Sequence, residues 1–95
     1  MATTLALLHL DVQIYQAMSL KDKRRVLKSF KDRVAHRFNV SIAEVDGLDL
    51  HRSATLAVAA VGNDRRRIES ILQRIVNAAG AHRDMVLVDH DVEWL

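Results

Sequence analysis

The chain contains no cysteine and no proline, only three glycines and only four aromatic residues. Without cysteine it can form no disulfide framework, no thiolate nucleophile and no zinc site built on sulfur. No apolar run approaches the roughly 20 residues that a membrane-spanning helix needs. The first ten residues lack a basic leader and continue into a strand-like alternation, so we do not interpret them as a secretion signal. We therefore expect a cytoplasmic protein without a membrane partner.

What is present is the composition of an ordinary globular protein. The 95 residues are 49% apolar and 27% charged, a balance that argues against disorder. This length is just sufficient to bury a core without the support of a metal or a disulfide. Because no repeat or linker interrupts the chain, we expect one domain over residues 1–95.

Hydrophobic periodicity predicts six elements in the order β-α-β-β-α-β. Apolar residues alternate with polar ones in most of the predicted strands and recur every three or four positions in the predicted helices. Ser19 precedes Asp22 by three positions, which is the spacing of a capping box, and Asn63 or Asp64 can cap the second helix. After Asp46, a two-residue hairpin is conceivable, but we favour a longer loop. The predicted strands span 5–14, 40–46, 54–61 and 85–93, and the predicted helices span about 20–37 and 64–80.

This element order is typical of the ferredoxin-like α+β sandwich, in which two helices pack on one face of a four-stranded antiparallel sheet. We expect strands one and three to be central, adjacent and parallel. Both helices would then begin at the same end of the domain. In the last strand, alternation places Val86, Val88 and Val92 toward the helices and Leu87 outward.

Two segments, SLKDKRRVLKSFKDRVAHRFNVSIAEVD (19–46) and RSATLAVAAVGND (52–64), resemble the YlxP-like family of small bacterial proteins, a domain of unknown function. Asp22 stands where the family usually has Glu, and Gly62 stands where Ser is common. The resemblance implies a ferredoxin-like fold and an association with bacterial gene clusters for translation initiation and ribosome assembly. It implies no established activity and no catalytic residues.

Charge is unevenly distributed, although the net charge is only +2. Twelve of the 14 Lys and Arg residues fall in segments 19–38 and 63–80 together with four acids, so these segments carry +8 and the remainder carries −6. The like charges four positions apart on the first helix and the arginines in the first turn of the second both disfavour an isolated helix. Such a distribution therefore points to a partner. The candidate RNA- or anion-binding residues are Lys21, Lys23, Arg24, Arg25, Lys28, Lys31, Arg65, Arg66 and Arg67.

If both helices begin at the same end, these cations and the free backbone N–H groups there would form an anion site. Lys23 falls within the apolar arc, and we expect its ammonium group to reach out to solvent. Contact with structured RNA or the ribosome is our first interpretation, because double-stranded RNA is read by shape and backbone without aromatic platforms. The alternative is that the basic faces are only solvated.

The sheet face that points away from the helices supports a second hypothesis, a protein–protein interaction module. A bare sheet face with many apolar residues is often covered by a second copy or another protein. We therefore expect a homodimer. The candidate interface residues are Leu7, Val45, Ala57, Ala59, Val61 and Leu87.

No group of residues has the pattern of an active site. Ser19 is better explained as a helix cap than as a nucleophile. The loop at 15–18 has neither Arg nor Gly with which to cradle phosphate in the manner of acylphosphatases. His9 and His90 are expected on opposite faces of the sheet and so do not form a metal site. We expect no catalysis, no cofactor, no metal and no small-molecule substrate.

Overall fold

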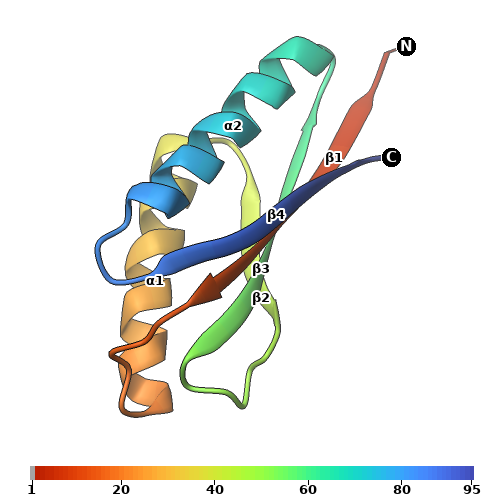
Figure 1. The fold of residues 1–95 in the computed structure, drawn as a ribbon. Helices are drawn as coiled ribbons and strands as arrows, with labels where there is room; N and C mark the ends of the chain where they lie inside the picture. Colours follow the sequence, from red (N-terminus) through yellow and green to blue (C-terminus); the bar gives the residue numbers. More distant parts are fainter. Residues whose placement is uncertain (1) are drawn as a thin grey trace.

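Six elements follow one another in the predicted order in the computed structural model, which describes residues 2–95 (Figure 1). Each boundary lies within one residue of its predicted position. Ser19 caps the first helix and Asp64 caps the second, so local capping signals explain where both helices begin. The elements are β1 (Thr4–Gln13), α1 (Leu20–Arg37), β2 (Ser41–Asp46), β3 (Ser53–Gly62), α2 (Arg65–Ala81) and β4 (Val86–Trp94).

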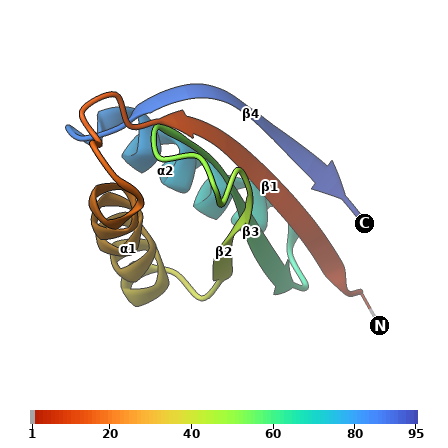
Figure 2. The ribbon, with the colours of Figure 1, turned by 90° about the horizontal axis from the view of Figure 1, so that it is seen from below.

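The four strands lie in the order β2-β3-β1-β4, and every neighbouring pair is antiparallel. Both helices pack on the same side of the curved sheet, and no described element covers the other side (Figure 2). This arrangement confirms the predicted ferredoxin-like sandwich.

The prediction that β1 and β3 are parallel is wrong, because the two strands pair in antiparallel register. The crossover through α1 makes β1 and β2 run in the same direction, and the connection from β2 to β3 then reverses the chain. The helices consequently begin at opposite ends of the molecule, as the ribbon shows (Figure 1). This correction changes the geometry of the candidate site.

The core lies between the sheet and the helices and is built mainly from the two central strands. Leu8 and Leu10 of β1 and Leu56 and Val58 of β3 are completely buried in one cluster with Phe30 of α1. Each side chain of this kind contributes about 1.5–3 kcal/mol when it is removed from water. The regular alternation of β1 and β3 therefore fixes which face of the sheet the helices cover.

The two edge strands each contain one extra residue that interrupts the alternation. In β4 the pairing with β1 shifts at Val88, and beyond this bulge Leu87 packs against the core while Val86 is exposed. The predictions that placed Leu87 outward and Val86 and Val88 inward are therefore wrong, whereas Val92 lies on the helix side as predicted. In β2 the pairing shifts at Val45, which is exposed at the bulge.

The connection between β2 and β3 spans residues 47–52, which confirms the longer-loop prediction. Gly47 begins this loop with φ +75°, a left-handed conformation that costs a residue with a Cβ about 1–2 kcal/mol. Its amide donates to Asp46 Oδ1 over 2.8 Å, and this turn positions its carbonyl toward α1.

We expect Gly47→Ala to lower the free energy of unfolding by about 1–2 kcal/mol, because alanine must adopt the left-handed conformation. Gly80→Ala is the matched control: Gly80 lies inside α2, and a Cβ there meets no atom within 4 Å. The control should raise stability by about 0.5–1 kcal/mol, since alanine favours the helix. Urea denaturation measures the free energy of unfolding of both variants. Equal effects of the two substitutions would contradict the left-handed conformation assigned to residue 47.

Candidate functional site

The exposed face of α1 carries a row of cations, which we call the α1 cation row and define as Lys21, Arg24, Arg25 and Lys28. All four side chains are exposed, and the 18-residue helix is about 27 Å long. Lys28 forms an exposed ion pair with Asp32, with Nζ and Oδ2 2.6 Å apart. Of the remaining predicted residues of this helix, Lys31 is half-buried and Lys23 is completely buried.

The predicted convergence of cations from both helices does not occur. Helix α1 begins at the end of the molecule where β1 ends, whereas α2 begins at the end where β3 ends (Figure 1). Arg66 and Arg67 belong to the first turn of α2 and so lie far from the start of the α1 cation row. Antiparallel pairing of β1 and β3 separates the two groups by roughly the length of the helices. Arg65 is moreover engaged elsewhere, because its guanidinium carbon lies 4.2 Å from the centre of the Trp94 ring.

Both helix N-termini are already capped by side chains of the chain itself. At α1 the Ser19 hydroxyl accepts from the Asp22 N–H (3.1 Å), and Asp22 Oδ2 accepts from the Met18 N–H (2.9 Å). At α2 the Asp64 carboxylate accepts from the N–H groups of Arg66 (3.0 Å) and Arg67 (3.4 Å). The helix amides that these caps occupy are not free for an external anion, and the two helices begin at opposite ends, so the predicted anion site at a shared helix end does not form.

Lys23 does not reach solvent, and that prediction is also wrong. Its Nζ donates to Glu44 Oε2 (2.7 Å) and to the carbonyl oxygens of Gly47 (2.9 Å) and Ser53 (3.2 Å). The ammonium thus joins α1 to β2, to the first residue of the loop at 47–52 and to the first residue of β3. Three hydrogen bonds and one opposite charge compensate its removal from water, so Lys23 stabilises the fold and is not available to a partner.

Sequence reasoning missed a second group of cations, which lies where the C-terminal half of α1 approaches α2 and the residues after it. The group consists of Arg33, Arg37, Arg74 and Arg83. The guanidinium groups of Arg37 and Arg74 lie 5.4 and 5.0 Å from the centre of the Phe38 ring. Arg33 lies one helical turn before Arg37 on the same flank of α1, a spacing that the sequence does reveal. The approach of Arg74 and Arg83 depends on the packing of the two helices, which the sequence does not reveal.

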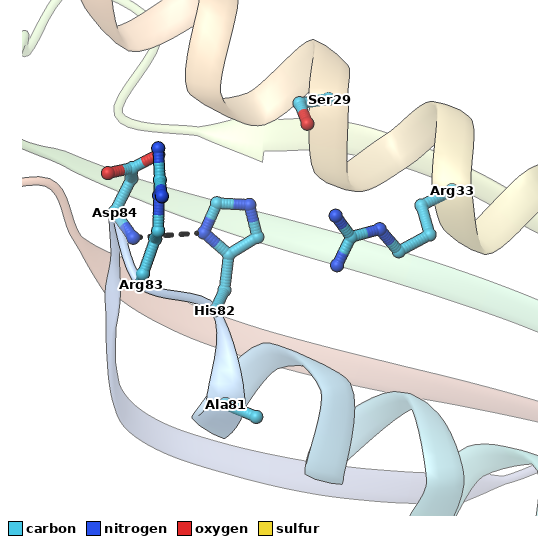
Figure 3. Close-up of a pocket in the computed structure, with 6 residues that line it drawn as sticks. All are labelled: Ser29, Arg33, Ala81, His82, Arg83 and Asp84. Atoms are coloured by element: carbon cyan, nitrogen blue, oxygen red, sulfur yellow. Dashed lines mark hydrogen bonds and ion pairs between the residues drawn. The ribbon is translucent and has the colours of Figure 1, made fainter.

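Arg33 and Arg83 line a pocket of about 420 Å³ together with Ser29, Ala81, His82 and Asp84 (Figure 3). Burial lowers the pKa of His82 below its ordinary value of 6.5; the Asp84 carboxylate opposes this shift, and the positive charges of Arg33 and Arg83 add to it. The lowered pKa favours the neutral imidazole of His82, which lies beside Arg33 and Arg83 in the pocket lining.

The uncovered sheet face combines an apolar centre with an acidic edge. Leu7, Ala57 and Ala59 are partly exposed there, and Val61 is 64% exposed beside them. Leu87 does not belong to this face, because it packs against the core. The acids lie to one side, on β4 and the adjoining part of β1: Asp11, Asp89, Asp91 and Glu93.

Metal-binding clusters and membrane-spanning helices are not features of the described part of the chain. Among residues 2–95, no three His, Asp or Glu side chains are placed to hold a metal ion. Neither α1 nor α2 has the length and apolar character needed to cross a membrane.

These features define a small ferredoxin-like α+β domain whose helix layer is cationic and whose sheet edge is acidic. The chain belongs to the family described as "Protein of unknown function (DUF503)", whose model matches residues 5–92. It is 44% identical over 81 residues to the "Uncharacterized protein YlxP" of Bacillus subtilis (strain 168), and this match covers 85% of the chain and 88% of that protein. The family resemblance seen in the sequence is thereby confirmed.

The fold also resembles that of a solved structure, the "De novo designed protein Foldit4". The TM-score is 0.56 at 16% sequence identity, and the alignment covers 98% of this chain and 96% of the designed one. At this level of identity the likeness concerns the fold alone.

Proposed function

We propose that the protein is a non-enzymatic accessory factor that binds structured RNA through the cations of its helix layer. The observation that supports this most directly is the lack of internal neutralisation. Within residues 2–95, only Lys23 and Lys28 of the twelve helix cations form ion pairs with a carboxylate. A surface with this much unpaired positive charge attracts a polyanion, and release of counterions from the polyanion favours binding.

The aromatic residues favour contact with the RNA backbone over reading of unpaired bases. Phe30 and Phe38 are buried in the core, and Trp94 is half-buried beneath Arg65. Tyr15, 64% exposed, is the one freely exposed aromatic ring among residues 2–95, and a single ring does not form a platform for successive bases. Stacking of unpaired bases requires exposed rings, whereas double-stranded RNA is recognised through its shape and its phosphates. The α1 cation row, on a helix about 27 Å long, can follow several consecutive phosphates of one groove.

A salt series tests this proposal. The association constant for an RNA duplex of about 16 base pairs should fall linearly with salt on a double logarithmic plot. With four phosphates contacted by the α1 cation row, the slope should be about −3 to −4. Fluorescence anisotropy between about 50 and 200 mM salt gives this slope. Absence of binding at the lowest salt, or binding that does not respond to salt, would rule out a phosphate-contacting surface.

We also propose that the chain forms a homodimer through its uncovered sheet face. The distribution of charge on that face supports a second copy as the occupant. If the two-fold axis runs along β3, the apolar centres around Ala57 and Ala59 meet, whereas the two acidic β4 strands lie at opposite rims. An apolar centre with a polar rim is the usual arrangement of a protein interface, and small residues let two sheets approach to about 10 Å.

Light scattering after size exclusion should therefore give twice the mass of the chain. Ala59→Glu should give the monomer mass, because it places a buried charge at the centre of the interface. Asp91→Ala changes a charge at the rim and should leave the dimer intact. A monomer at high protein concentration in the unaltered chain would contradict the dimer without affecting the RNA proposal.

A further inference from the structure

The pocket between α1 and the loop after α2 gathers donors from two elements that are far apart in the sequence. Ser29 and Arg33 come from α1, and His82 and Arg83 come from the connection between α2 and β4. The close-up shows the Arg33 guanidinium on one side of the His82 ring and the Arg83 and Asp84 side chains on the other (Figure 3). The space bounded by Ser29, Arg33 and His82 is therefore separated from the only carboxylate that lines the pocket.

The His82 ring is held in a defined tautomer and orientation. Its Nδ1 accepts a hydrogen bond from the Asp84 N–H over 3.1 Å. A neutral imidazole that accepts at Nδ1 carries its proton on Nε2. In Figure 3 this second nitrogen points away from Asp84, toward the space between Ser29 and Arg33. Edge-to-face contact with the Phe30 ring, with centroids 6.0 Å apart, further fixes the ring.

The charges around the pocket favour an anion. Arg33 and Arg83 supply two positive charges and Asp84 one negative charge, which leaves an excess of one positive charge while His82 is neutral. The C-terminal end of α2 opposes this with about half a negative charge from the helix dipole, because Ala81 ends the helix at the pocket. The excess charge exceeds the contribution of the dipole, so the site as a whole remains positive.

We propose that this pocket binds one phosphate group, held by the Arg33 guanidinium, the Nε2–H of His82 and the Ser29 hydroxyl. A planar guanidinium presents a fork of donors that matches phosphate oxygens, and the other two groups add one donor each. The inference rests on the proposed RNA function in one respect, namely that a backbone phosphate of structured RNA is the intended ligand. Free phosphate has the same chemistry and is the alternative source.

The imidazole resonances of His82 report binding directly in a titration with inorganic phosphate at constant ionic strength. Phosphate should shift the Nε2 resonance and raise the pKa of His82, since a neighbouring anion favours the imidazolium. Arg33→Gln should weaken phosphate binding about tenfold or more, and Ser29→Ala should weaken it less. Arg66→Gln is the matched control: it removes the same charge at the N-terminal end of α2, whereas the pocket lies at the C-terminal end of that helix. Its phosphate affinity should stay within about twofold of the unaltered chain, because a distant exposed charge is screened by salt.

A second titration with the RNA duplex separates this inference from the proposed function. If RNA shifts His82 and competes with phosphate, the pocket takes a backbone phosphate. If phosphate shifts His82 but the chain binds no RNA, the pocket is a phosphate site and the RNA function fails. If RNA binds the unaltered chain and Arg33→Gln equally and phosphate leaves His82 unchanged, the pocket proposal is overturned while the RNA function stands.

Discussion

Glu44→Ala is expected to lower the free energy of unfolding by about 3–5 kcal/mol, which is a large share of the stability of a domain of this size. The substitution leaves the Lys23 ammonium completely buried without its opposite charge. The two carbonyl oxygens of Gly47 and Ser53 remain as its acceptors but carry no net charge. The midpoint of thermal unfolding should fall by at least about 12 °C.

The matched control is the other ion pair of α1, Lys28–Asp32. Its side chains are 74% and 65% exposed, against 1% and 14% for Lys23 and Glu44. Asp32→Ala should therefore change stability by no more than about 0.5 kcal/mol. The double replacement Lys23→Met with Glu44→Leu should recover part of the loss, because it removes both charges together. A cost below about 1 kcal/mol for Glu44→Ala would mean that the ammonium finds water or another acceptor.

Arg24→Glu combined with Lys28→Glu is expected to weaken binding of the RNA duplex by about a hundredfold or more at low salt. Each replaced cation removes a charge-assisted hydrogen bond worth about 1.5–3 kcal/mol, and the new carboxylates repel phosphate. The salt slope should also become shallower by about one unit for each phosphate that the variant no longer neutralises. Both residues are exposed on α1, so circular dichroism should show the helix content retained.

Arg66→Glu with Arg67→Glu changes the net charge by the same amount at the opposite end of the molecule. If the α1 cation row binds the duplex, this variant should lose less than about fivefold in affinity, through long-range attraction alone. Equal losses in the two variants would show that net charge, and not the α1 surface, governs binding.

The elements of the fold were predictable because their signals are local. Alternation in β1, the continuous apolar run of β3 and the caps at Ser19 and Asp64 each depend on a few neighbouring residues, and the boundaries followed from them. The errors arose where the outcome depends on partners elsewhere. A single extra residue at Val88 reversed the facing of Leu87, and pairing with β1 rather than the sequence of β4 determines where such a bulge falls.

The candidate site was predictable only in part, for similar reasons. The exposed arc of α1 follows from helical spacing, so the α1 cation row was predictable. The burial of Lys23 was not, because its compensating acid, Glu44, lies 21 positions away on another element. The pocket at His82 was likewise not predictable, because Arg33 comes from α1 and His82 from the connection after α2. The antiparallel direction of β3 relative to β1, by contrast, follows from the connections between the elements alone. It places the starts of α1 and α2 at opposite ends of the molecule.

The bulges in β2 and β4 have a consequence for the behaviour of the chain at high concentration. These two strands form both free edges of the sheet, where unpaired backbone groups would otherwise template the addition of strands from other molecules. An extra residue in each edge breaks the regular ladder, and β4 also presents Asp89, Asp91 and Glu93. Both features disfavour the addition of strands from other molecules at either edge of the sheet.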